Sequence, residues 1–191
     1  IFSLPQQLVI PLFQRPYVWD EDEQWAPLWQ DLRRVAELRL TGQAPNATHF
    51  LGAVVVQAQD AQLGVLTASN VIDGQQRLTT LQLAVDATAA VLEERGYLAL
   101  SGQLISLTHN QSNFVGAGES ALKIRHTNRD KAAFDEVMSA EAPVDYGALK
   151  HSSSKLVRAH QYFAGEVAKW LDETPADQAD EAAGALVAAW T

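Results

Sequence analysis

The residue types best suited to chemistry lie in one short polar turn of this chain. The turn consists of Asp73, Gly74, Gln75, Gln76 and Arg77. An apolar run ends directly before it and leucines at helical spacing follow it, so the turn should join a buried strand to a helix. Because the first turn of a helix leaves backbone N–H groups unpaired, helix starts bind anions. Amide donors and an arginine here therefore predict an anion site, with phosphate as its natural ligand.

The same turn also has a purely structural interpretation. Asp73 can serve as the N-cap of the helix, with Gln76 three residues later at the capping-box position. Most such caps bind nothing. Helix starts favour acidic residues, however, so Arg77 carries a small electrostatic cost that a bound anion would offset.

A second candidate segment spans residues 11–19. Prolines at positions 11 and 16 forbid a regular helix and disfavour a central strand, so the segment should be extended and rigid. Its aromatic side chains can simply close the core, Trp19 above all. Gln14 and Arg15 have no core role, and they predict a binding edge.

Three sequence runs resemble a known family. They are Ile-Pro-Leu-Phe-Gln-Arg-Pro-Tyr-Val-Trp at 10–19, Phe-Leu-Gly-Ala-Val-Val at 50–55 and Asp-Gly-Gln-Gln-Arg-Leu-Thr-Thr-Leu at 73–81. In this order they are similar to the N-terminal domain of the GmrSD type IV restriction endonucleases. That family has a ParB/sulfiredoxin-like fold and includes SspE-type defence nucleases that respond to phosphorothioate-modified DNA. The resemblance covers most of the chain and is strongest in its N-terminal half.

The resemblance implies that the turn binds and hydrolyses a nucleoside triphosphate, GTP or ATP, and so regulates a C-terminal nuclease domain elsewhere in the protein. Mg²⁺ is the expected cofactor. The expected catalytic residues are Asp73, Gln75, Gln76 and Arg77, and the expected nucleotide-binding residues are Gly74, Gln75, Arg77 and Arg15.

A mechanism for such a site follows from these residue types. Backbone N–H groups of Gly74 and Gln75 would hold a phosphate. Arg77 and Arg15 would neutralise charge on the transferred group, and Gln75 or Gln76 would orient the attacking water. Three roles remain open for Asp73: it caps the turn, holds a magnesium-bound water or acts as the base.

The alternative function is a binding module without catalysis, which grips modified DNA and reports it to a nuclease. The expected sensing residues are Phe13, Gln14, Arg15, Pro16 and Tyr17. An apolar pocket at Phe13, Pro16 and Tyr17 would suit the sulfur of a phosphorothioate. Both functions require Arg15 and Arg77 to face one cavity, whereas a purely structural scaffold would leave them exposed and apart.

The element pattern predicts an α/β (α+β) fold, with a mixed sheet, flanking helices and a helical C-terminal part. Strands are expected at 8–10, 50–56 and 65–72, the last two buried on both faces, and helices at 20–40 and 75–95. Residues 96–119 should be loop-like, and helices should follow at 127–138, 152–171 and from 175 onward. A ParB-like domain is expected over 1–120 and a helical extension over 121–191, continuing into a further C-terminal region.

The composition limits the class of protein. The 191 residues contain 14 Lys and Arg against 23 Asp and Glu, for a net charge of −9, which argues against DNA binding through charge alone. Two basic groups, at 123–131 and 150–160, are candidates for DNA contact or simply solvated helix faces. The chain has no cysteine, which excludes zinc–thiolate sites and fits a cytoplasmic location. It lacks a P-loop, a Gly-x-Gly-x-x-Gly motif and any apolar run long enough for a membrane role.

Overall fold

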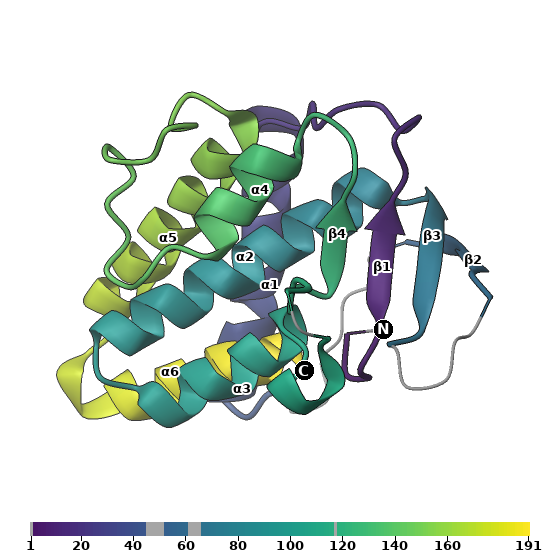
Figure 1. Ribbon diagram of the computed structural model, residues 1–191. Helices are drawn as coiled ribbons and strands as arrows, with labels where there is room; N and C mark the ends of the chain where they lie inside the picture. The colour runs from purple at the N-terminus through teal and green to yellow at the C-terminus, as the bar shows by residue number, and fades with distance from the viewer. Residues whose placement is uncertain (1, 45–51, 61–65, 117) are drawn as a thin grey trace.

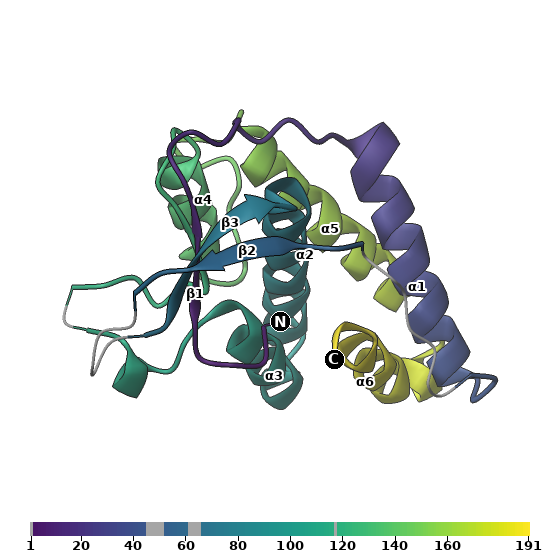
Figure 2. The ribbon, with the colours of Figure 1, turned by 90° about the vertical axis from the view of Figure 1, so that its right-hand side faces the viewer.

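The computed structural model describes residues 2–44, 52–60, 66–116 and 118–191. Within these ranges a small sheet packs against a layer of helices (Figure 1, Figure 2). The strands are β1 (Gln7–Ile10), β2 (Val55–Ala58), β3 (Ala68–Asp73) and β4 (Ile124–His126). The α-helices are α1 (Ala26–Leu40), α2 (Gln75–Glu94), α3 (Leu98–Thr108), α4 (Lys131–Met138), α5 (Lys155–Glu173) and α6 (Ala179–Trp190). The predicted α/β class with a mixed sheet is confirmed.

The strand order is β2-β3-β1-β4. The central strand β1 runs parallel to both β3 and β4, while β2 is an antiparallel edge strand. Parallel neighbours end at the same edge of a sheet, so the segment after β1 and the turn after β3 emerge side by side. This topology brings residues 11–19 next to the turn that starts at Asp73.

The central helix of the fold is α2, which lies between the sheet and α5 (Figure 2). The leucines that follow the turn at helical spacing, Leu78, Leu81 and Leu92, are buried, as is Val85 on the same face. The remaining faces are buried as well, because α3 and α5 pack along α2 on other sides. The turn before α2 is therefore anchored to a helix that is buried on most of its sides.

The predicted burial of the strands at 50–56 and 65–72 and the predicted loop at 96–119 are wrong. The predicted strand at 50–56 begins outside the described residues, and of its described part only Val55 and Val56 lie in β2, which is exposed throughout because it is an edge strand. The strand expected at 65–72 forms as β3, but it is not buried on both faces, since Ile72 is 42% exposed. The segment at 96–119 was expected to be a loop but contains α3. There Leu104 is fully buried and Ile105 packs against the core, so tertiary packing outweighs the Ser and Gly content.

The C-terminal helices form close to the predicted positions. Ser154 caps α5 by accepting a hydrogen bond from the backbone N–H of Leu156, as expected. The predicted start of the helix at 127–138 is wrong, because α4 begins at Lys131 with Asp130 in the N-cap position. The expected domain boundary at residue 120 falls just before β4, and β4 pairs with β1 in the sheet.

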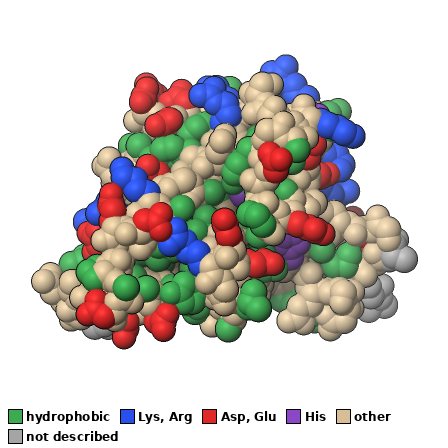
Figure 3. Space-filling model, turned by 90° about the vertical axis from the view of Figure 1, so that its left-hand side faces the viewer, with side chains coloured by type: hydrophobic (Ala, Val, Ile, Leu, Met, Phe, Trp, Pro, Cys, Tyr) green, Lys and Arg blue, Asp and Glu red, His purple; other side chains and the backbone are tan. Residues whose placement is uncertain are grey.

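The charged residues on the helical side of the molecule are mixed in sign. Figure 3 shows acidic and basic side chains interspersed over this side. A short helical segment, Glu21–Trp25, precedes α1, and Asp20 caps it by accepting a hydrogen bond from the Glu23 N–H at 3.4 Å. None of the helices in the described ranges has the length and apolarity needed to cross a membrane.

Candidate functional site

A cavity of about 390 Å³ opens where the chain leaves β1 and β3. Its lining residues are Gln14, Arg15, Trp19, Asp73, Gly74, Gln75, Gln76 and Arg77. The cavity thus joins the predicted turn to the predicted binding edge. Arg15 and Arg77 both line it, which is the arrangement that both functional hypotheses require and that the scaffold hypothesis does not.

The turn owes its shape to Gly74. This glycine has φ of 93°, in the left-handed region that side chains rarely adopt, and a Cβ placed on it would lie 3.0 Å from Cγ2 of Val54. Gly74 also occupies the N-cap position of α2, where no side chain caps the helix. The prediction that Asp73 is the N-cap is therefore wrong, because Asp73 is the last residue of β3. The uncapped helix start keeps N–H donors available for a ligand.

The two glutamines of the turn hold the binding edge in place. Nε2 of Gln75 donates to the backbone carbonyl of Arg15 at 3.2 Å. Nε2 of Gln76 donates to the carbonyl of Pro16 at 3.0 Å, and its Oε1 accepts the N–H of Val18 at 2.9 Å. Gln76 therefore does not form the predicted capping box. Both ends of its amide are occupied, whereas the amide of Gln75 makes only its donor bond among the described residues.

A reciprocal contact runs from the edge to the sheet. Nε2 of Gln14 donates to the carbonyl of Ile72 at 2.9 Å and to that of Val71 at 3.2 Å. The segment after β1 is consequently fastened to the end of β3 by Gln14 and to the start of α2 by Gln75 and Gln76. Such cross-bracing suits a site that must hold its shape before a ligand arrives.

The two arginines differ in how tightly they are held. Nη1 of Arg77 donates to the carbonyl of Ala53 at 2.7 Å. Its guanidinium also packs on Gly52, where an added Cβ would lie 2.9 Å from Cζ of Arg77. The exposed side chain of Arg15 forms no hydrogen bond or ion pair within the described residues, and the same holds for the carboxylate of Asp73. Among the described residues, the cavity therefore offers one cation held by a hydrogen bond, Arg77, together with one cation and one carboxylate that have no partner there, Arg15 and Asp73.

Three predicted sensing residues do not line the cavity. Tyr17 is buried, and its hydroxyl lies 2.6 Å from Oγ1 of Thr80 and accepts the indole N–H of Trp25 at 2.9 Å. Burial raises the pKa of Tyr17 well above the ordinary value of a phenol. Phe13 points into solvent with 79% of its surface exposed. The predicted apolar pocket formed by Phe13, Pro16 and Tyr17 is therefore wrong, because the aromatic rings face different environments.

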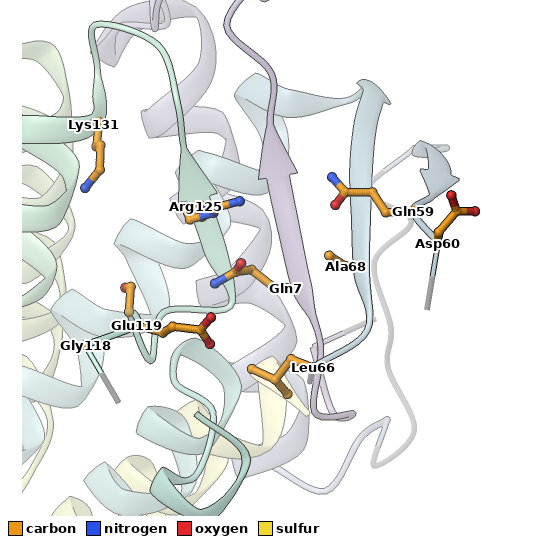
Figure 4. Close-up of a pocket in the computed structure, with 10 residues that line it drawn as sticks. Gln7, Gln59, Asp60, Leu66, Ala68, Gly118, Glu119, Arg125 and Lys131 are labelled. Atoms are coloured by element: carbon orange, nitrogen blue, oxygen red, sulfur yellow. The ribbon is translucent and has the colours of Figure 1, made fainter. Parts of the chain in front are cut away.

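The fold buries part of each predicted basic group and leaves the rest exposed. Lys123, His126 and His160 are buried, so these three residues are not available for DNA contact. His160, for example, lies with Nε2 3.2 Å from the Asp86 carboxylate. Arg125 is exposed and borders a second cavity, of about 460 Å³, on the face of the sheet opposite α2 (Figure 4).

Sequence reasoning missed two contributors to the first cavity. Trp19 was expected to close the core, yet it lines the cavity as well as packing on the core. Gly52 had no assigned role, and the structure shows that it provides the space for the Arg77 guanidinium. Its left-handed φ of 87° could not be recognised without knowing the backbone around it.

A comparison with protein families identifies the type of domain. The family model described as GmrSD restriction endonuclease, N-terminal domain, matches residues 1–182. The chain belongs to this family. No individual curated protein matches it. Membership makes this GmrSD N-terminal domain a module of a restriction-endonuclease system, the kind that acts in antiphage defence. The match includes both segments that form the cavity and most of the C-terminal helices.

Proposed function

We propose that this GmrSD N-terminal domain binds a nucleoside triphosphate, ATP or GTP, at the turn from Asp73 to Arg77 and hydrolyses it to regulate a nuclease domain of the same system. The observation that carries the proposal is the meeting of Arg15 and Arg77 in one cavity beside the uncapped start of α2. Two cations and a helix N-terminus in one place match the charge of a polyphosphate.

Binding would begin with the backbone of the turn. The N–H groups in the first turn of α2 donate to phosphate oxygens, and the positive end of the helix dipole adds to their effect. Arg15 can move to meet a phosphate because its side chain has no other partner among the described residues. Arg77 is already fixed by Ala53, so it costs little conformational entropy when a ligand arrives.

Hydrolysis would then use the remaining polar groups. A water oxygen attacks the γ-phosphorus, the bond from that phosphorus to the β–γ bridging oxygen breaks, and the water proton passes to Asp73 or to solvent. The carbonyl oxygen of Gln75 orients the water, because Gln76 has both ends of its amide engaged. Arg15 and Arg77 stabilise the negative charge that the leaving diphosphate develops.

Magnesium fits the donor set of this cavity. Mg²⁺ in nucleotide sites is held by one or two carboxylates together with phosphate oxygens and water. Asp73 is a carboxylate with no partner among the described residues, and it lines the cavity. Bound there, Mg²⁺ would neutralise phosphate charge. No group of three or more His, Asp or Glu residues in the described ranges is placed to hold a metal without such a substrate.

Modified-DNA sensing at the same cavity is the second candidate. It is favoured by the exposure of Arg15, which can reach a phosphate or phosphorothioate on a DNA strand as well as one on a nucleotide. Both candidates place the chain within DNA restriction, and they differ in whether the turn performs chemistry.

Salt and magnesium dependence separate the two candidates. Phosphate release from ATP or GTP should require Mg²⁺ and change little with salt. DNA binding through phosphates weakens steeply as salt rises. Magnesium-dependent release by the purified chain supports hydrolysis. Salt-sensitive DNA binding with no phosphate release under any condition would refute hydrolysis and support modified-DNA sensing.

A further inference from the structure

The turn directly before the cavity exposes two large apolar side chains. Leu12 is 75% exposed and Phe13 is 79% exposed, the highest values among the large hydrophobic residues of the described ranges. Side chains of this size are usually buried, and adjacent exposed ones mark surfaces that meet a partner. The two side chains lie beside the cavity that we propose binds phosphate, and this position indicates the chemical class of the partner.

The turn is held firmly although its tip is exposed. The N–H of Gln14 donates to the carbonyl of Pro11 at 3.0 Å, which closes a tight turn with Leu12 and Phe13 at its centre. The side chain of Gln14 then fastens the turn to the end of β3 through Val71 and Ile72. These hydrogen bonds therefore fix the position of Phe13 on the protein surface.

The next residues along the chain carry the polar half of the site. Gln14 and Arg15 follow Phe13 directly, and both line the cavity. An aromatic side chain next to a phosphate site is the arrangement by which proteins hold a nucleobase and its phosphates together. Two arginines beside the uncapped start of a helix match phosphate groups, so the cavity favours a nucleotide.

We propose that Phe13, supported by Leu12, is a stacking platform for the base of the nucleotide whose phosphates occupy the cavity. This inference rests on the proposed binding of a nucleotide at the turn. Phe13 has no hydrogen-bonding group with which to read the edge of a base, so stacking alone holds it. The site consequently accepts adenine and guanine with similar affinity and binds pyrimidine nucleotides more weakly.

The same stacking chemistry would accept a base from a free nucleotide or an unpaired base from a DNA strand. The test uses the whole chain and four probes: ATP, GTP, tripolyphosphate and a single-stranded DNA oligonucleotide. Binding is measured by calorimetry for the unchanged protein, Phe13→Ala, Phe13→Trp and Leu98→Ala. Leu98 is a matched control, since it is 67% exposed and lies at the start of α3, away from the cavity.

Phe13→Ala should weaken ATP and GTP binding about tenfold and leave tripolyphosphate binding unchanged. Phe13→Trp should restore nucleotide affinity, and Leu98→Ala should behave like the unchanged protein. If only the oligonucleotide binds more weakly to Phe13→Ala, the platform holds a base of DNA. If Phe13→Ala binds ATP, GTP and DNA as the unchanged protein does, the platform is refuted.

Failure of the proposed function would look different. If the protein binds nucleotides in a Phe13-dependent manner but releases no phosphate, the stacking platform is supported and the proposed hydrolysis is refuted. If tripolyphosphate, ATP, GTP and DNA all fail to bind, both the proposed anion site in the cavity and the stacking platform beside it are refuted.

Discussion

Nε2 of Gln76 donates to the carbonyl oxygen of Pro16 at 3.0 Å, although 60 positions separate the two residues in the chain. The other end of the same amide accepts the N–H of Val18. A buried glutamine at the start of α2 thereby completes the hydrogen bonding of the segment that carries Arg15. Together with the hydrogen bond from Gln75 to the carbonyl of Arg15, this contact positions Arg15 through the backbone, because the Arg15 side chain has no partner among the described residues.

Replacing Gln76 should therefore affect both stability and function. In Gln76→Leu the carbonyl of Pro16 and the N–H of Val18 lose their partner, which should lower the free energy of unfolding by about 2 kcal/mol. Urea unfolding measures the loss. Gln103→Leu is the control, because Gln103 is exposed on α3 and should change stability by less than about 0.5 kcal/mol. Equal stability of the two variants would show that the contact contributes nothing.

Two glycines with similar backbone angles allow a test of how Arg77 is placed. Gly52 has φ of 87° and Gly96 has φ of 84°, so alanine strains the backbone at both sites by about 1 kcal/mol. A Cβ added at Gly52 would lie 2.9 Å from Cζ of Arg77, whereas a Cβ added at Gly96 would have no neighbouring atom within 4 Å. Phosphate release should fall sharply in Gly52→Ala and stay near normal in Gly96→Ala. Equal rates of phosphate release in the two variants would contradict a role for the placement of Arg77.

The pH dependence of stability should report the buried His126. Burial lowers the pKa of this imidazole to about 4, and the nearby Asp130 carboxylate opposes the shift only in part. The unfolded chain, with a histidine pKa near 6.5, binds the proton first, so the contribution is complete above pH 6.5 and is lost as pH falls toward 4. Its full size is on the order of 3 kcal/mol.

The measurement for His126 is a difference between two proteins. Unfolding free energies of the unchanged protein and of His126→Gln are compared between pH 7 and pH 4. The variant should lose less stability over this interval, even if it is less stable at pH 7. His109, whose pKa burial also lowers, remains in both proteins and cancels in the comparison. Parallel pH profiles would mean that His126 titrates normally in the folded state.

The location of the site could be predicted from the sequence because its pattern is local. An apolar run, a glycine and a helical leucine pattern are continuous from residue 71 to residue 81, and each indicates a strand-to-helix turn. The meeting of Arg15 with Arg77 was expected only as a condition of function. It follows from β1 lying parallel to β3, which no local pattern specifies.

The roles of the glutamines could not be predicted for the same reason. Their partners are backbone groups of residues 15–18, and any residue type supplies such groups. The capping box was a reasonable local alternative, but the long-range contacts displaced it. The loop expected near α3 and the buried strand expected near β2 were wrong because burial depends on which elements pack against a segment. The local composition of the segment does not show which elements these are.

The central claim is that the cavity hydrolyses nucleoside triphosphates, and Arg15 provides its most direct test. Phosphate release from ATP and GTP should be measured with Mg²⁺ for the unchanged protein, Arg15→Ala and Arg158→Ala. Arg158 is an exposed arginine on α5 that does not line the cavity, so it controls for the lost charge. The account predicts normal release by Arg158→Ala and at least about a tenfold loss in Arg15→Ala, with unchanged folding. Release at the same rate by all three proteins would contradict it.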